Sequence, residues 1–177
     1  MEPGKLIKKC IQNNRKAQHQ LFELYSDRLY VVAIRYLKNR FAAEEVIGNA
    51  FLKIFQSLDC LRYEGEIKFV AWMRRIVVNE ALMEIRRMKQ MPAFTNEFPE
   101  IISTSGSGEN MYYDELVNQI DKLPDGYRLV FKLYVIEGYN HAEVADLLQI
   151  SEGTSKSQLH KARLQLQQLL IKSENYG

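Results

Sequence analysis

Apolar residues recur at three- and four-residue steps through most of the first half of the chain, which is the spacing of a helix with one buried side. In residues 16–38 the apolar positions are Leu21, Leu24, Tyr25, Leu29, Val32, Ala33, Tyr36 and Leu37. The same pattern returns in residues 42–58 and 67–88, and more briefly in residues 6–13. The first half of the chain therefore predicts four helices.

The periodicity stops in residues 91–110, which contain two prolines and the run Ser-Thr-Ser-Gly-Ser-Gly. That composition is typical of a linker. Helical spacing then resumes in residues 112–122, 127–137, 141–148 and 152–170. The pattern predicts an all-α protein of two small helical domains, residues 1–92 and 111–177, joined by a flexible linker at 93–110.

Residues 139–163 have the pattern of a helix-turn-helix. Small and apolar residues mark a first helix, Ile150 occupies the turn as a buried residue, and Ser151 stands at the N-cap of a second helix. The second helix places one set of residues toward the core: Leu159, Ala162, Leu166 and Leu169. Its other side carries Lys156, Ser157, His160 and Lys161. Such a helix fits the major groove of DNA, and the alternative is a solvated amphipathic hairpin packed on its neighbours.

Charge is divided unevenly along the 177 residues, although the net charge is only +2 and the hydrophobic content of 46% is ample for a core. Residues 1–92 carry 17 Lys and Arg against 10 Asp and Glu, whereas residues 93–127 carry 1 against 7. Residues 128–177 are nearly balanced, with 6 against 5. A basic first half favours a polyanionic partner, which would repel the acidic middle segment.

The residues that bind metals in proteins show no metal-ligand spacing. Cys10 and Cys60 are far apart, and His19, His141 and His160 form no cluster with them, so the sequence predicts no metal and no cofactor. No apolar run reaches membrane-spanning length, and the N-terminus lacks the pattern of a signal peptide. These features favour a cytoplasmic protein with two reduced thiols and no membrane insertion.

The order of motifs along the chain carries a family resemblance. The first domain reads LFELYSDRLYVVAIRYLKN, AAEEVIGNAFLKIFQSL and KFVAWMRRIVVNEALMEIRR, and the second reads IDKLPDGYRLVFKLYVIEGYNHAEVADLLQISEGTSKSQLHKAR. Over nearly its whole length the chain resembles a group 4 (extracytoplasmic-function, ECF) sigma factor of bacterial RNA polymerase, in the sigma-70 family. The resemblance implies a factor that binds polymerase core, recognises promoter −10 and −35 elements and promotes strand opening, while polymerase does the chemistry.

Residues 42–58 match the helix with which this family grips a coiled coil of the largest polymerase subunits. Such an interface has apolar anchors within a polar rim, and the implied contacts are Glu45, Asn49, Phe51, Lys53 and Ile54. The sequence departs from the family at Gly48, where Gln is usual, and at Asn49, where an acidic residue is usual. The alternative for Phe51 and Ile54 is that they fill the domain core.

Residues 68–89 match the helix that handles the opened −10 element, and residues 57–68 match a loop that holds a flipped base of the non-template strand. Strand opening needs cations for the phosphates and surfaces for unstacked bases. The implied DNA contacts are Arg62, Tyr63, Lys68, Arg74, Arg75, Asn79, Arg86 and Arg87. Trp72 shares the helical phase of Phe69 and Ile76, which favours a core position.

The helix-turn-helix matches the reader of the −35 element in this family. The implied contacts are Arg128, Thr154, Ser155, Lys156, Ser157, His160 and Lys161. Lysines suit phosphates, which carry no sequence information, whereas Ser157 and His160 suit base edges. The acidic linker, with Glu97, Glu100 and Glu109, matches the segment that threads the polymerase near the RNA exit path.

The implied partners are RNA polymerase core, promoter DNA and an anti-sigma factor, and two alternatives remain open. A stand-alone helix-turn-helix repressor or activator would bind duplex DNA as a dimer on a palindrome, and the strand-opening surface around Asn79 argues against it. An adaptor with the same fold would bind only an anti-sigma protein, and the departures at Gly48 and Asn49 leave room for it. No nucleophile–base pair, metal cluster or phosphate loop indicates an enzyme.

Overall fold

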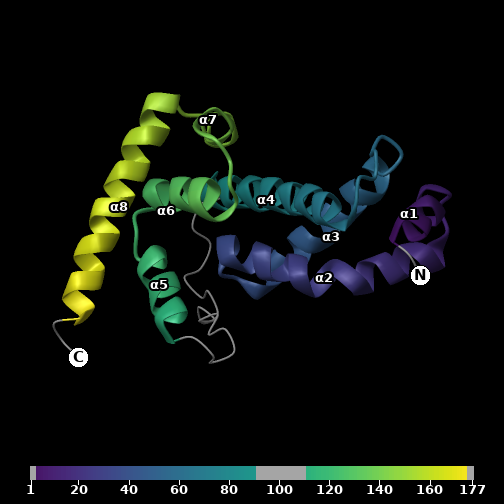
Figure 1. Cartoon of the computed structure of the whole chain (residues 1–177), viewed down its shortest axis with the longest axis horizontal. Helices are drawn as coiled ribbons and strands as arrows, with labels where there is room; N and C mark the ends of the chain where they lie inside the picture. The colour runs from purple at the N-terminus through teal and green to yellow at the C-terminus, as the bar shows by residue number, and fades with distance from the viewer. Residues whose placement is uncertain (1–2, 91–110, 175–177) are drawn as a thin grey trace. The chain divides into compact units, whose positions relative to one another are not determined.

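The computed structural model describes residues 3–90 and 111–174, and the regular elements in these ranges are all helical (Figure 1). The chain divides into two compact units, Met1–Ile102 and Ser103–Gly177, called unit 1 and unit 2 below. The prediction of an all-α protein with two helical parts is confirmed. The predicted linker, with its three glutamates, lies outside the described residues.

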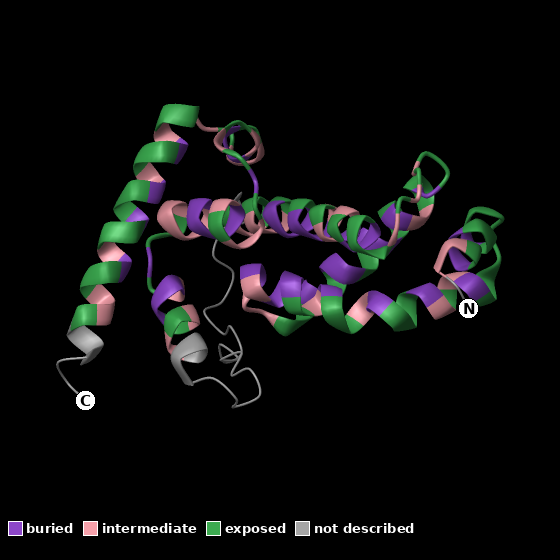
Figure 2. Cartoon of the chain, viewed as in Figure 1, coloured by how far each residue is buried: buried purple, intermediate pink, exposed green. Residues whose placement is uncertain are grey.

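Unit 1 contains α1 (Pro3–Ile11), α2 (Arg15–Leu37), α3 (Arg40–Ser57) and α4 (Glu66–Gln90). Helices α2, α3 and α4 pack on one another in all three pairs, and α1 packs on α2. Burial follows one side of each of these helices (Figure 2). The largest fully buried side chains of the unit are Leu6, Leu21, Leu29, Ile54, Leu58, Met73, Val77 and Val78.

Asparagines set the joints between the first three helices. Asn13 has a left-handed φ of 56°, a conformation that Asn adopts more readily than most residues, and α1 ends two residues earlier than predicted because of it. The side-chain oxygen of Asn14 accepts a hydrogen bond from the Ala17 N–H at 3.1 Å, and that of Asn39 accepts one from the Ala42 N–H at 3.1 Å. These N-caps fix where α2 and α3 begin.

Unit 2 contains α5 (Met111–Asp121), α6 (Asp125–Phe131), η1 (Lys132–Ile136), α7 (His141–Leu148) and α8 (Glu152–Glu174). Helix α8 packs against α5, α6 and α7. Its buried residues are Ser155, Leu159, Ala162 and Leu166, and they meet a core that includes Leu123, Val130, Leu133 and Val144. The predicted apolar side of the second helix of the helix-turn-helix is therefore confirmed, except that Leu169 is only half-buried.

The predicted helix at 127–137 is divided into α6 and a π-helical turn, η1. In this turn the Glu137 N–H donates to the Lys132 carbonyl at 3.0 Å. Lys132 is only 2% exposed, and its ammonium donates to Asp121 Oδ1 at 2.9 Å. A π-turn contains one residue more than an α-helical turn, and the apolar pattern of the sequence did not indicate it.

Candidate nucleic-acid and partner interfaces

Some of the predicted polymerase contacts on α3 are exposed, and others are buried in the core. Glu45, Asn49 and Lys53 are exposed. Phe51 is 3% exposed and Ile54 is 0% exposed, so the prediction that these two anchor a partner is wrong. The Phe51 ring packs against Phe22 at a centroid distance of 4.6 Å, because its helical phase faces α2 rather than solvent.

Leu52 is an apolar surface residue near the middle of α3 that the sequence interpretation missed. It is 60% exposed, and it follows Glu45 and Asn49 at seven- and three-residue steps, so the three share one helix face. The signal was available in the sequence, since Leu52 falls outside the stripe formed by Val46, Ala50 and Ile54. Phe41, which is 70% exposed and lies eleven residues before Leu52, shares this face. Two apolar side chains within a polar face have the composition of anchors with their rim.

Two ion pairs join α3 to α4. Lys53 donates to Glu80 Oε1 at 2.6 Å, and the Glu80 side chain is only 10% exposed. Glu45 lies 3.4 Å from the Arg87 guanidinium, which also binds Glu84 at 2.7 Å. These hydrogen bonds to Glu84 raise the pKa of Arg87. Lys53 and Glu45 of α3 thus both contribute to the joint between the two helices.

The loop between α3 and α4 contains a small hollow. It has a volume of about 200 Å³ and is lined by Leu61, Arg62, Tyr63, Glu64, Lys68 and Phe69. Phe69 is 2% exposed and contacts the Tyr63 ring edge-on at 6.0 Å, while Trp72 stacks on Phe69 at 5.8 Å. Gly65, with φ of 107°, makes the turn that returns the chain into α4. Tyr63 is therefore held at the wall of the hollow by a buried ring.

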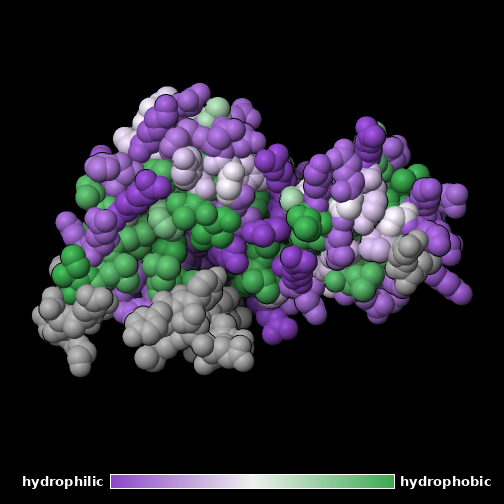
Figure 3. All heavy atoms as spheres, viewed as in Figure 1, coloured by the Kyte–Doolittle hydropathy of each residue, from purple (hydrophilic) through white to green (hydrophobic). Residues whose placement is uncertain are grey.

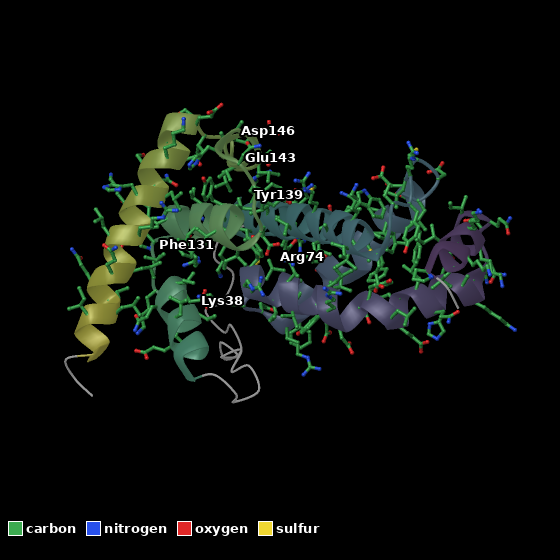
Figure 4. The ribbon with its side chains drawn as sticks, viewed as in Figure 1. Lys38, Arg74, Phe131, Tyr139, Glu143 and Asp146 are labelled. Carbon is green, nitrogen blue, oxygen red and sulfur yellow. The ribbon has the colours of Figure 1, made fainter. Side chains whose placement is uncertain are left out.

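Four of the predicted −10 contacts form one line along α4. Lys68, Arg75, Asn79 and Arg86 follow each other at steps of seven, four and seven residues, and all four are exposed. At about 1.5 Å per residue this line is roughly 27 Å long. We call it the α4 stripe. Arg74, which lies on α4 (Figure 4), is half-buried and points away from the stripe by its helical phase, as does Arg87.

The joint between α7 and α8 has the predicted helix-turn-helix chemistry. Asn140 and Glu143 form a capping box at the start of α7, with both hydrogen bonds at 2.9 Å. Glu143 and Asp146 lie on α7, and Tyr139 lies on the segment that leads into it (Figure 4). The Ser151 hydroxyl accepts a hydrogen bond from the Thr154 N–H at 3.0 Å. The predicted N-cap of α8 is therefore confirmed, whereas Ile150 is only half-buried.

The end of unit 2 where α7 meets the start of α8 is largely hydrophilic in the space-filling view (Figure 3). Four predicted −35 contacts are exposed there, namely Lys156, Ser157, His160 and Lys161. Thr154 is half-buried, and its carbonyl accepts a hydrogen bond from the Ser157 hydroxyl at 3.0 Å. Lys156 lies 3.8 Å from Glu152, with both side chains exposed, which is a weak pairing in water.

Ser155 is the predicted base contact that the structure contradicts. It is 0% exposed, and its hydroxyl is 2.9 Å from the Nδ1 atom of His141, where the two share a hydrogen bond. The His141 ring stacks on Tyr134 at a centroid distance of 4.3 Å and an angle of 25°. These three residues, the Tyr134–His141–Ser155 latch, come from η1, α7 and α8.

The Arg128 side chain forms its hydrogen bonds within unit 2. Its guanidinium donates to the Leu123 carbonyl at 3.0 Å and to the Asp121 carbonyl at 3.4 Å, and it also pairs with Asp125. Its side chain is 20% exposed. We therefore assign Arg128 to the joint between α5 and α6, and its phosphate contact stays a prediction.

Within residues 3–90 and 111–174, no three His, Cys, Asp or Glu side chains come together as metal ligands would. Cys10 is buried and Cys60 is exposed, and both are free thiols. Hydrogen bonding to Asp59 raises the pKa of the Cys60 thiol, so little reactive thiolate is present at neutral pH. None of the described helices combines the length and apolarity that a membrane crossing requires.

Comparison with known proteins identifies the chain. The family model for Sigma-70 region 2 matches residues 21–90, and that for Sigma-70, region 4 matches residues 113–166. An ECF RNA polymerase sigma factor of Bacillus subtilis, SigW, is 28% identical over 183 residues, which cover 93% of this chain and 97% of the relative. The chain is an ECF sigma factor of the sigma-70 family.

A second relative of this sigma factor is SigE of Mycolicibacterium smegmatis, also named as an ECF RNA polymerase sigma factor. It is 29% identical over 160 residues, which cover 86% of this chain, and the chain spans only 61% of its length. Among solved structures, the sigma factor RpoE in complex with the anti-sigma factor NepR from Bartonella quintana is similar, with a TM-score of 0.57 and 21% identity. That match covers 86% of this chain and 96% of the other, and it supports the shared helical fold.

Each of the two matched regions of the sigma factor lies within one of the two units. Region 2 spans α2, α3 and α4, so it includes the α3 face, the hollow and the α4 stripe. Region 4 reaches from α5 into α8 and includes the latch and the polar start of α8. Helix α1 lies outside both matches.

Proposed function

We propose that this sigma factor binds RNA polymerase core through the exposed face of α3, opens the −10 element with the α4 stripe and the adjoining hollow, and reads the −35 element with the start of α8. The protein supplies no catalytic group, since polymerase makes the RNA. Its place of action is the cytoplasm, with promoter DNA and polymerase. By analogy with the Bartonella quintana complex, an anti-sigma factor is a further proposed partner.

The α4 stripe is the observation that carries the proposal. Three cations and one amide lie on a single helix face, so phosphates along one strand meet positive charge while Asn79 reaches a base edge. The hollow beside it contains an aromatic wall at Tyr63 and a cation at Arg62. Unstacked bases bind to surfaces that combine these two chemistries. A repressor that binds only duplex DNA has no use for a surface that holds unstacked bases.

The exposed residues of α8 support −35 recognition in two ways. Lys156 and Lys161 are long cations on the surface and suit phosphates, which contribute affinity without sequence preference. His160 is exposed one turn beyond Lys156 and offers a donor or acceptor to a base edge. The Ser157 hydroxyl donates its hydrogen to the Thr154 carbonyl. His160 is therefore the stronger candidate for base readout.

Replacing Leu52 with Asp should weaken capture of polymerase core, because a charge at the centre of an apolar anchor has to be desolvated on binding. We expect at least a tenfold loss of affinity, about 1.4 kcal/mol, with unchanged helical circular dichroism. The measurement is co-purification of the full chain with purified core. Ile67→Asp is the matched control, since Ile67 is 88% exposed, lies in the same unit and gains the same charge outside α3. Equal capture by the Leu52 variant and wild type would rule out this face.

Strand opening should depend on the α4 stripe. In transcription reconstituted with polymerase core, Asn79→Ala and the pair Arg75→Ala with Arg86→Ala should reduce open-complex formation on a duplex promoter. The loss should be much smaller on a promoter with a pre-melted −10 bubble, because the cost of unpairing is already met there. Permanganate footprinting reports the opened bases. Gln12→Ala, an exposed polar substitution that lies before α2 and outside the proposed interfaces, serves as the control, and an equal loss on both templates would contradict a role in opening.

A further inference from the structure

The Tyr134–His141–Ser155 latch joins three separate elements at the base of the proposed DNA-reading helix. His141 is the first residue of α7 and lies within the capping box, between Asn140 and Glu143, that fixes the start of that helix. Ser155 lies in the first turn of α8, and Tyr134 lies in η1. A ring stack at 4.3 Å and a hydrogen bond at 2.9 Å connect them. The start of α8 is therefore tied to a residue whose own backbone position is already fixed.

The hydrogen bond between His141 and Ser155 differs in kind from the other contacts that hold α8 in the core. Leu159, Ala162 and Leu166 bury apolar surface, and apolar packing is non-directional, so it resists separation of the helices more than rotation. A hydrogen bond weakens steeply when its angle changes. The Ser155 hydroxyl is fully buried, and a buried hydroxyl without a partner costs free energy. Rotation of α8 that breaks this bond is consequently penalised.

Rotation of α8 matters because Ser155 immediately precedes the exposed residues. Successive residues of an α-helix are about 100° apart, so the direction of Ser155 fixes the directions of Lys156, Ser157 and His160. We propose that the latch is a positioning device that sets the rotation of α8 and thereby determines which of its side chains face the −35 bases. This inference rests on the proposed function of α8 and names residues that do not touch DNA themselves.

Three variants separate the parts of the latch. Ser155→Ala removes the hydroxyl, His141→Phe keeps a ring on Tyr134 but removes the hydrogen bond, and His141→Asn keeps a donor and acceptor near the Nδ1 position. Combining Ser155→Ala with His141→Phe removes both polar partners together. Because no buried hydroxyl remains without a partner, this pair should recover much of the stability lost in His141→Phe alone.

The experiment is promoter competition with the full chain and polymerase core, across −35 variants that share one −10 element. We expect the ratio between the preferred and the poorest −35 sequence to fall by roughly fivefold in Ser155→Ala and in His141→Phe, the loss expected from one hydrogen bond. His141→Asn should retain most of that ratio. The double variant should regain the amide-exchange protection of unit 2 while its ratio stays low, a combination that a purely stabilising contact cannot produce.

The reference variants make each outcome decisive. His160→Ala reports loss of a direct base contact, and Gln167→Ala, exposed near the far end of α8, should behave as wild type. A ratio that recovers with stability in the double variant, or that never changes in the single variants, overturns the latch as a positioning device while leaving −35 reading intact. Wild-type transcription that ignores the −35 sequence would overturn both the proposed function of α8 and this inference.

Discussion

Asp121→Ala should destabilise unit 2 by about 3 kcal/mol. The substitution takes the carboxylate away from the Lys132 ammonium, whose side chain is 3% exposed, so a charge remains in the core without this partner. Lys132→Met should cost much less, roughly 1 kcal/mol, because the remaining Asp121 carboxylate is 26% exposed and can be hydrated. Asp121→Ala should cost more stability than Lys132→Met because Lys132 is the more deeply buried partner.

A probe specific to unit 2 is needed to measure this difference, since a chain of two units does not give one two-state transition. The only tryptophan, Trp72, lies in unit 1 and does not report on the pair. Hydrogen exchange of backbone amides in α6, η1 and α8 gives the free energy of opening for unit 2 alone. Equal protection in the two variants, or lower protection in Lys132→Met, would contradict the buried-ammonium account.

The helices of both units were predictable because each buries one side, and a one-sided helix leaves a 3.6-residue apolar period in its sequence. The π-turn at Lys132–Ile136 was not predicted, and its first residue, Lys132, forms a buried ion pair with Asp121, eleven residues earlier. Its sequence looks like a continued helix that has one lysine on the wrong side. Local periodicity contains no information about which distant group satisfies a buried charge.

The candidate sites were predictable as helices but not as individual side chains. The family resemblance indicated that α3 binds a partner, and it drew attention to Phe51 and Ile54, which the packing of α2 and α4 buries. Similarly, Ser155 is small and polar and stands within the start of the DNA-reading helix, so it was interpreted as a contact. Its burial depends on His141, fourteen residues away, whose hydrogen bond satisfies a hydroxyl that the core would otherwise exclude. The line of Lys68, Arg75, Asn79 and Arg86, by contrast, was already readable from helical spacing.

Ile54→Ala should have a large effect on unit 1, about 2–5 kcal/mol of unfolding free energy. Ile54 is 0% exposed, on a helix that packs against both α2 and α4, so removal of its branched side chain leaves a cavity in the core of the unit. Trp72 belongs to the same unit, and its fluorescence during urea unfolding therefore measures this loss directly. Leu52→Ala, two residues earlier and 60% exposed, should change the free energy by at most about 0.5 kcal/mol.

The two truncations also separate folding from partner binding. Under conditions where both variants stay folded, Leu52→Ala should lose part of its affinity for polymerase core, since truncation removes a surface anchor. Ile54→Ala should keep its affinity for core at low temperature and lose it only as unit 1 unfolds, so its capture should follow the Trp72 signal. If folded Ile54→Ala fails to bind core while Leu52→Ala binds normally, the residue that faces the polymerase is Ile54, and the orientation of α3 deduced from its burial is wrong.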